Sequence, residues 1–236
     1  IYLPFKKKKK TRAMVAIENG LEPLAKIISQ QNYIDIFKEA ERFISEKVKT
    51  ADDALAGARD IIAEWINENE EARQKMRYLF RKSATISTTL VKGKEAEAQK
   101  YKDYFAYSEP LEKCPSHRML AVRRAESEGF IRLNIHPSEE DAFLILDKIF
   151  IKEYNDAGHQ VQLAIRDSYK RLMEPSIETE FRNLSKEKAD EEAIKVFTNN
   201  LKQLLLEAPL GNKAIMGLDP GFRTGCKIVC LDLNGQ

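Results

Sequence analysis

The sequence predicts a mainly α-helical protein with a small two-stranded β element and a β-hairpin at its C-terminal end. Apolar side chains recur at helical spacing through most of the 236 residues. Two runs, near 84–93 and 130–136, are rich in β-branched residues or alternate apolar with polar, which predicts a pair of strands. Residues 214–236 have the pattern of a strand, a turn and a second strand, which predicts the hairpin.

Helix signals can be placed in order along the chain after a stretch at 1–13 that we expect to be extended. Thr50 is followed three residues later by Asp53. This is a capping box with aspartate in place of the usual glutamate, and it predicts the start of a helix. Gly57 inside that helix indicates the close approach of a neighbouring helix. Pro175 is expected to end or kink the helix that contains it. The expected helices cover about 21–28, 32–46, 50–66, 70–82, 94–102, 116–127, 138–154, 157–183 and 186–207.

Composition indicates a chain that folds and carries no strong charge bias. The hydrophobic fraction is 43%, which is enough for a buried core. With 39 basic and 37 acidic residues the net charge is +2, so only local clusters can argue for a nucleic-acid partner. The longest apolar stretch, near 142–151, is too short to cross a bilayer, and no signal-peptide pattern is present. We therefore expect a cytoplasmic protein.

The cysteines and histidines do not suggest a metal or cofactor site. Cys114, Cys226 and Cys230 form no CxxC pair, so we interpret them as reduced thiols. The three histidines are far apart, and no phosphate-binding, dinucleotide-binding or HExxH motif occurs. No serine or cysteine has a recognisable catalytic partner. The sequence therefore predicts no catalytic residue, no metal site and no cofactor.

The first candidate binding site is a basic run near the start of the chain. Six positive charges fall within seven residues, which can neutralise several phosphates in a salt-dependent way. The alternative is a solvated linker. The residues concerned are Lys6, Lys7, Lys8, Lys9, Lys10 and Arg12.

The second candidate is the start of the helix expected at 116–127. Ser116 or His117 would lie at the helix N-terminus, where unpaired N–H groups favour an anion. The alternative is that Ser116 is an N-cap and His117 a hydrogen-bonded structural residue. The basic side chains that would complete a phosphate site are Arg118, Arg123, Arg124 and Arg132.

Asp219 is the third candidate. A carboxylate at the end of an apolar strand, followed by Pro-Gly and another strand, is the opening pattern of RNase H-like domains, in which an acidic cluster binds divalent metal. A single carboxylate is not a cluster, and Asp219 can equally cap a turn. We expect no metal at Asp219 in this chain.

Several strings resemble the bacterial Tex transcription accessory proteins, in the order of that family and over essentially the whole chain. They lie at residues 2–5, 11–13, 20–25, 54–65, 92–95, 105–110, 115–118, 197–206 and 217–226. One local departure is Ala125, where the family often has glycine.

The resemblance implies a modular, nucleic-acid-binding protein. Whole Tex proteins carry a helical region, a YqgF-type RNase H-like domain, helix-hairpin-helix units and an OB-fold RNA-binding domain. On this basis residues 1–212 would be the helical central region and residues 213–236 the first hairpin of a truncated YqgF domain. Asp219 matches the first acidic position of that domain, and the family is not generally regarded as catalytic. The chain, which begins at Ile1 rather than Met, would then be an internal piece of a longer protein.

Three functional hypotheses follow. The leading one is a non-catalytic scaffold segment of an RNA-binding or DNA-binding transcription accessory protein of the Tex type. The second is part of a Mg²⁺-dependent RNase H-like nuclease or resolvase. The third is a protein-interaction module that docks on the transcription machinery, because a docking stripe and a core stripe on a helix look alike in sequence.

Overall fold

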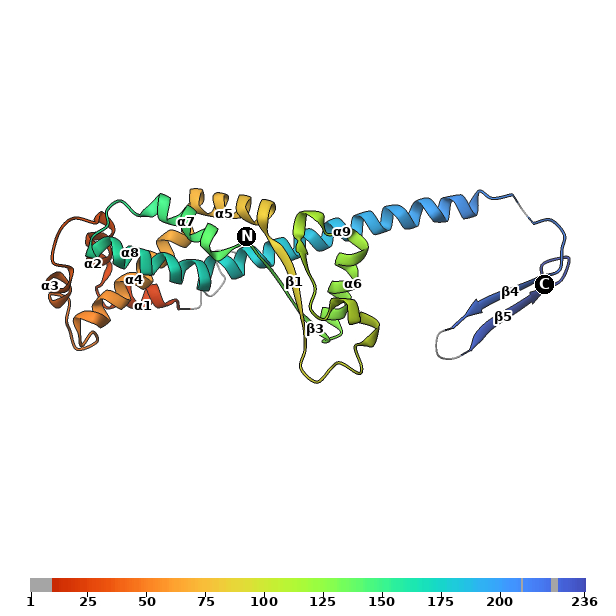
Figure 1. The fold of residues 1–236 in the computed structure, drawn as a ribbon, viewed down its shortest axis with the longest axis horizontal. Helices are drawn as coiled ribbons and strands as arrows, with labels where there is room; N and C mark the ends of the chain where they lie inside the picture. Colours follow the sequence, from red (N-terminus) through yellow and green to blue (C-terminus); the bar gives the residue numbers. More distant parts are fainter. Residues whose placement is uncertain (1–9, 209, 222–224) are drawn as a thin grey trace. The chain divides into compact units, whose positions relative to one another are not determined.

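Helices make up most of the structure, as Figure 1 shows. The computed structural model describes residues 10–208, 210–221 and 225–236. Contacts group them into two units, one ending at Glu191 and one beginning at Glu192. The α-helices are α1 (Arg12–Glu18), α2 (Glu22–Gln30), α3 (Ile36–Glu41), α4 (Ala51–Glu68), α5 (Glu70–Ser83), α6 (Ser116–Ser127), α7 (Glu139–Phe150), α8 (Asp156–Asp167) and α9 (Glu174–Leu205).

Helix α4 lies at the centre of the first unit. The predicted capping box is confirmed: Thr50 Oγ1 accepts from the Asp53 N–H at 3.1 Å, and Asp53 Oδ2 accepts from the Thr50 N–H at 3.1 Å. Helices α1, α2, α3 and α8 all pack against α4. The buried side chains of α4 therefore form the middle of the core, and they are Ala54, Leu55, Ala58, Ile61, Ile62, Ala63 and Ile66.

Gly57 explains how closely the first helices approach α4. A Cβ atom at Gly57 would lie 2.3 Å from Leu21 Cδ1 and 3.3 Å from Ala16 Cβ. Leu21 and Ala16 are both buried, and the end of the Leu21 side chain would have to shift to admit a Cβ at Gly57. The prediction that Gly57 marks a close helix–helix approach is confirmed.

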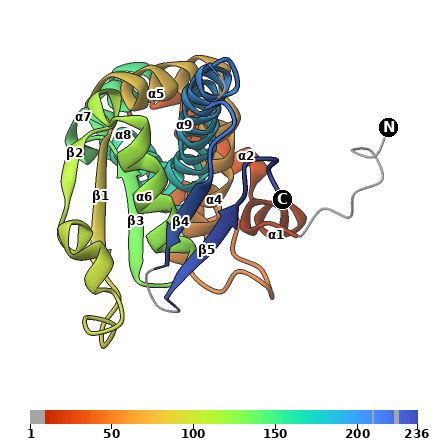
Figure 2. The same ribbon diagram turned by 90° about the vertical axis from the view of Figure 1, so that its right-hand side faces the viewer.

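The β element has three strands rather than two. Strand β1 (Thr85–Leu90) pairs antiparallel with β3 (Ile131–His136), as predicted. A third strand, β2 (Ser108–Pro110), pairs with the other side of β1, in a segment that we expected to be a loop. Its three residues are too few to show the alternation by which a strand is recognised in sequence. Helix α6 packs on β3 (Figure 2).

Side chains from α9 cover the open edge of β3. Glu178 Oε1 accepts a hydrogen bond from the Ile135 N–H at 3.0 Å. Arg182 Nη1 donates to the Leu133 carbonyl at 2.7 Å, and its Nη2 donates to Glu126 Oε1. These contacts satisfy backbone groups that an edge strand otherwise leaves available to another chain.

The helix around Pro175 continues instead of ending or kinking there. The π-helical turn Ser168–Met173 connects α8 directly to α9, which runs on through the segment expected to be a separate helix at 186–207. Pro175 is the second residue of α9 and follows the turn in which the hydrogen-bond pattern widens. The N–H that Pro175 lacks is thus missing from a helix that continues, next to a turn whose hydrogen bonds span five residues. The prediction that the helix ends at Pro175 was therefore wrong.

Four other boundaries differ from the predictions. Helix α1 begins inside the stretch expected to be extended, and α3 is much shorter than the expected 32–46. Helix α7 ends at Phe150, because Ile151 is extended, and not near Tyr154. The segment expected as a helix at 94–102 holds turns and then a 3-10 helix, Gln99–Tyr104, and another short 3-10 helix follows at Leu111–Lys113.

The second unit contains the predicted hairpin. Strand β4 (Ile215–Pro220) pairs antiparallel with β5 (Cys226–Leu231), with Ile215 opposite Leu231 and Pro220 opposite Cys226. Apolar side chains of both strands are more than half exposed, and they are Met216, Leu218, Ile228 and Val229. The hairpin therefore leaves apolar surface uncovered among the described residues.

The cysteines are free in the structure. Cys114 is half-buried, whereas Cys226 and Cys230 are exposed on β5. Of the helices in the described ranges, none combines the length and the apolar character required to cross a membrane.

The first prediction concerns Gly57. We expect Gly57→Ala to lower the free energy of unfolding by about 1–3 kcal/mol, because overpacking outweighs the better helix propensity of alanine. Chemical denaturation of both proteins measures the change. In a Leu21→Ala background the same substitution should cost clearly less, because the opposing methyl groups are gone. An equal cost in both backgrounds would contradict the contact.

The second prediction concerns the covered edge of β3. Arg182→Met should lower the free energy of unfolding by about 1–3 kcal/mol, because the Leu133 carbonyl and Glu126 lose a donor. The exposed Arg81 provides a matched control, and Arg81→Met should stay within about 0.5 kcal/mol of the parent. Equal effects of the two substitutions, measured by urea unfolding, would refute the role of Arg182.

Candidate nucleic-acid interface

The basic run enters the described structure at a fixed point beside α4. Lys6, Lys7, Lys8 and Lys9 lie outside the described residues. Thr11 caps α1 by accepting from the Met14 N–H at 3.1 Å, and its hydroxyl donates to Glu64 Oε2 of α4 at 3.3 Å. Lys10 Nζ lies 2.5 Å from Glu18 Oε2, and because both side chains are 58% exposed this ion pair contributes little stability.

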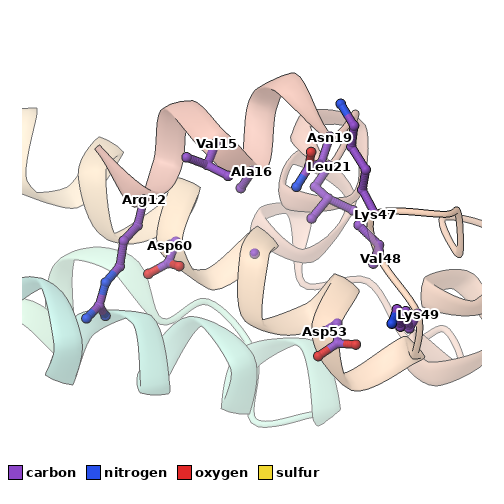
Figure 3. A pocket seen from close by; sticks show the side chains of 11 residues that line it. Arg12, Val15, Ala16, Asn19, Leu21, Lys47, Val48, Lys49, Asp53 and Asp60 are labelled. Atoms are coloured by element: carbon purple, nitrogen blue, oxygen red, sulfur yellow. The ribbon is translucent and has the colours of Figure 1, made fainter. Parts of the chain in front are cut away.

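A hollow of about 420 Å³ lies between α1, α4 and the loop 42–49. Figure 3 shows Arg12 on one side of it, with Lys47 and Lys49 on the other. All three side chains are exposed. The structure thus brings one predicted site residue, Arg12, together with two lysines that the sequence analysis did not single out.

The loop 42–49 places Lys47 and Lys49 through the residue between them. Val48 is 3% exposed and belongs to the core. A small turn fixes it, because the Ser45 N–H donates to the Val48 carbonyl at 2.8 Å and the Val48 N–H donates back at 3.2 Å. With Val48 anchored inward, its two neighbours project outward. The pattern Lys-Val-Lys directly before the helix cap Thr50 is the signal that could have found them.

Two carboxylates, Asp53 and Asp60, also line the hollow. Asp53 is engaged in the capping box of α4. Asp60 Oδ1 lies 3.4 Å from Arg171 Nη2. Burial raises the pKa of Asp60 above its ordinary value, and the neighbouring Arg171 opposes that rise. Both carboxylates therefore have structural partners within the fold.

In the second predicted cluster, at the start of α6, some of the basic side chains form contacts within the fold. Arg118 Nη1 donates to Glu109 Oε2 at 2.7 Å and to the Tyr107 hydroxyl at 3.1 Å, which ties α6 to β2. Burial acts to raise the pKa of Glu109, but Cys114, Tyr107 and Arg118 outweigh it and lower the pKa. Burial and Glu109 together raise the pKa of Cys114 to about 12, so this thiol stays protonated and unreactive at neutral pH.

The remaining residues of that cluster do not converge on one point. Arg123 Nη1 donates to Glu126 Oε2 at 2.7 Å, on the same carboxylate that Arg182 reaches. His117 and Arg124 are exposed on α6. Arg132 is exposed on β3, opposite Thr89 of β1. The structure therefore gives Arg118 and Arg123 internal carboxylate partners and leaves His117 and Arg124 on the surface.

Asp219 lies on β4, where it is exposed and opposite Lys227. Asp232, which follows β5, accepts from the Asn234 and Gln236 N–H groups at 2.9 Å each. These two hydrogen bonds lower the pKa of Asp232. Within the described ranges, three or more His, Cys, Asp or Glu side chains do not gather as a metal ion would require.

Comparison with known proteins gives consistent similarities. A family described as "Tex central region-like" matches residues 33–197. The "Transcriptional accessory protein Tex" of Neisseria gonorrhoeae is 36% identical over the whole chain, and the "Protein YhgF" of Escherichia coli is 38% identical over the whole chain. The human "S1 RNA-binding domain-containing protein 1" is 27% identical over 97% of the chain. The chain spans 32% of each bacterial relative and 24% of the human protein, about a third of their length or less.

The contacts of Arg118 generate a third prediction. Arg118→Met should lower the free energy of unfolding by about 1–3 kcal/mol, because the partly buried Glu109 carboxylate loses its cationic partner. Arg124→Met on the same helix is the matched control and should change stability by less than about 0.5 kcal/mol. Thermal and urea unfolding measure both. If Arg124→Met costs as much as Arg118→Met, the structural role of Arg118 is wrong.

Proposed function

Because this chain belongs to the Tex central region-like family, we propose that it is a non-catalytic scaffold segment of a nucleic-acid-binding transcription accessory protein. The family match over residues 33–197 carries the proposal. The printed names of the relatives support it, since one is a transcriptional accessory protein and another contains an S1 RNA-binding domain. The proposal places the protein in the cytoplasm, where free thiols stay reduced.

The distribution of charge in the first unit supports a scaffold. Many ion pairs join different elements of the fold instead of converging on a cleft. Two hydrogen bonds of 2.8 Å hold Arg166 on α8 to Asp147 on α7. Arg77 on α5 donates to both oxygens of Glu180 on α9 at 2.9 Å. Such pairs fix the relative positions of helices, which is what a segment that orients neighbouring modules requires.

Contact with nucleic acid is assigned to the basic N-terminal segment. Lys6–Lys10 and Arg12 provide charge that is clustered in the sequence, and Arg12 lines the hollow. Phosphate neutralisation by such residues gives weak binding that is sensitive to salt. His117 and Arg124 are exposed and can add further phosphate contacts. Arg118 and Arg123 act in this proposal mainly through their structural ion pairs.

We also propose that residues 213–236 form the first hairpin of a YqgF/RNase H-like domain and residues 1–212 the helical central region. The hairpin includes the Tex-like string 217–226, and the exposed apolar side chains on its strands supply a surface for the rest of such a domain. Asp219 then occupies the first acidic position. The proposal gives it no catalytic role within this chain.

A salt titration tests the proposed function. Fluorescence anisotropy with a labelled single-stranded RNA should show weak binding whose log K falls with log[salt] at a slope of about −4, if all six basic residues contact phosphates. Replacing Lys6–Lys10 with glutamine should remove most of that slope. Tight, sequence-specific binding that persists at high salt would contradict a scaffold with an electrostatic contact.

A further inference from the structure

We propose that the hollow between α1, α4 and the loop 42–49 binds the phosphodiester backbone of a single nucleic-acid strand, with Arg12 on one side and Lys47 and Lys49 on the other. This inference rests on the proposed nucleic-acid function and gives it a defined site. The basic run alone would bind polyanions without fixing where they lie. The hollow supplies cations from two elements far apart in sequence, on opposite sides of one depression (Figure 3).

The placement of the cations matches a ligand with more than one phosphate. Figure 3 shows Val15 and Ala16 of α1 between the Arg12 side chain and the two lysines, Lys47 and Lys49. Successive phosphates of a strand that lies across the hollow could contact cations on both sides, and each contact would release counterions.

The backbone positions that carry the cations are fixed before any ligand binds. Arg12 is the first residue of α1, whose start is tied to α4 through Thr11 and Glu64. Lys47 and Lys49 flank the anchored Val48. Backbone positions that are already fixed reduce the entropy lost on binding. In the sequence the lysine run ends at Lys10, two residues before Arg12, so positive charge is continuous along this part of the chain.

The interior of the hollow determines the kind of anion it favours. The groups that act electrostatically on Asp60 are Arg12, Arg59 and Arg171, which are positive, and Asp167, which is negative. A carboxylate inside the hollow repels a phosphate that enters deeply, so phosphates stay at the rim. Between the cations the wall is apolar, formed by Val15, Ala16 and Leu21, with the Asn19 amide beside it. A nucleobase can cover such a surface, whereas a bare polyphosphate gains nothing from it.

The test uses the full 236-residue chain and a matched pair of double variants. Lys47→Gln/Lys49→Gln removes the charge on one side of the hollow. The control Lys38→Gln/Lys148→Gln removes the same charge from exposed positions outside it. Binding of a labelled RNA of about 20 nucleotides is measured from roughly 0.05 to 0.3 M salt. The first variant should reduce the salt slope by about 1.4 and weaken binding about tenfold or more at 0.1 M, whereas the control should change neither clearly.

The outcomes separate this inference from the proposed function. If the parent protein binds RNA with strong salt dependence but both double variants bind equally well, the hollow is excluded and the proposed function remains. If the parent binds no RNA even at low salt, the nucleic-acid contact itself is wrong. Unlabelled polyphosphate should displace RNA poorly at equal phosphate concentration. Displacement as efficient as that by unlabelled RNA would overturn the assignment to a nucleic-acid strand.

Discussion

The close contact at Gly57 is the constraint on which the rest of the first unit depends. Helix α4 is buried among α1, α2, α3 and α8, so its neighbours can pack only as closely as its side chains allow. Without a Cβ at Gly57, Leu21 and Ala16 reach the α4 backbone. Glycine in a helix costs about 1 kcal/mol relative to alanine, and at Gly57 the close packing of α1 and α2 on α4 stabilises the fold by more than that.

This packing places α1 at a fixed position along α4. The position of α1 in turn places Arg12 at the same hollow as Lys47 and Lys49. Thr11 can bond to Glu64 only because α1 begins next to α4. The hollow lies along α1, between that helix, α4 and the loop 42–49 with Lys47 and Lys49. Packing of apolar side chains thus determines where positive charge gathers. In the sheet, by contrast, charged side chains stabilise the apolar part of the fold. Glu178 and Arg182 complete the hydrogen bonding of β3.

The fold could be predicted from sequence wherever the signal is local and repeated. The capping box at Thr50, the stripe along α4, the pairing of β1 with β3 and the hairpin all follow from patterns within a few residues. Three features could not be predicted in this way. Strand β2 is too short to alternate, the π-helical turn that contains the buried Tyr169 has no sequence pattern of its own, and the helix continues through Pro175 directly after that turn.

In the candidate site, too, local patterns reveal the residues but not the tertiary contacts between them. The charge of Arg12 and the lysine run is visible in the sequence, but only the tertiary structure brings Arg12 to the same hollow as Lys47 and Lys49. Arg118 and Arg123 show the opposite case. Their sequence pattern predicts an anion site, yet Glu109 and Glu126 engage them, and Glu109 lies on a strand that local patterns did not reveal.

The central claim is that the packing of α1 on α4 creates the place where nucleic acid binds. Photo-crosslinking of the full chain to RNA that contains 4-thiouridine, followed by peptide mapping, tests it most directly. We predict that crosslinks concentrate in residues 10–21 and 43–57, and that they decrease there in the Gly57→Ala variant, which disturbs the contact while leaving every basic residue in place. Crosslinks that concentrate on α6 or on the hairpin, or that are unchanged by Gly57→Ala, would contradict the account.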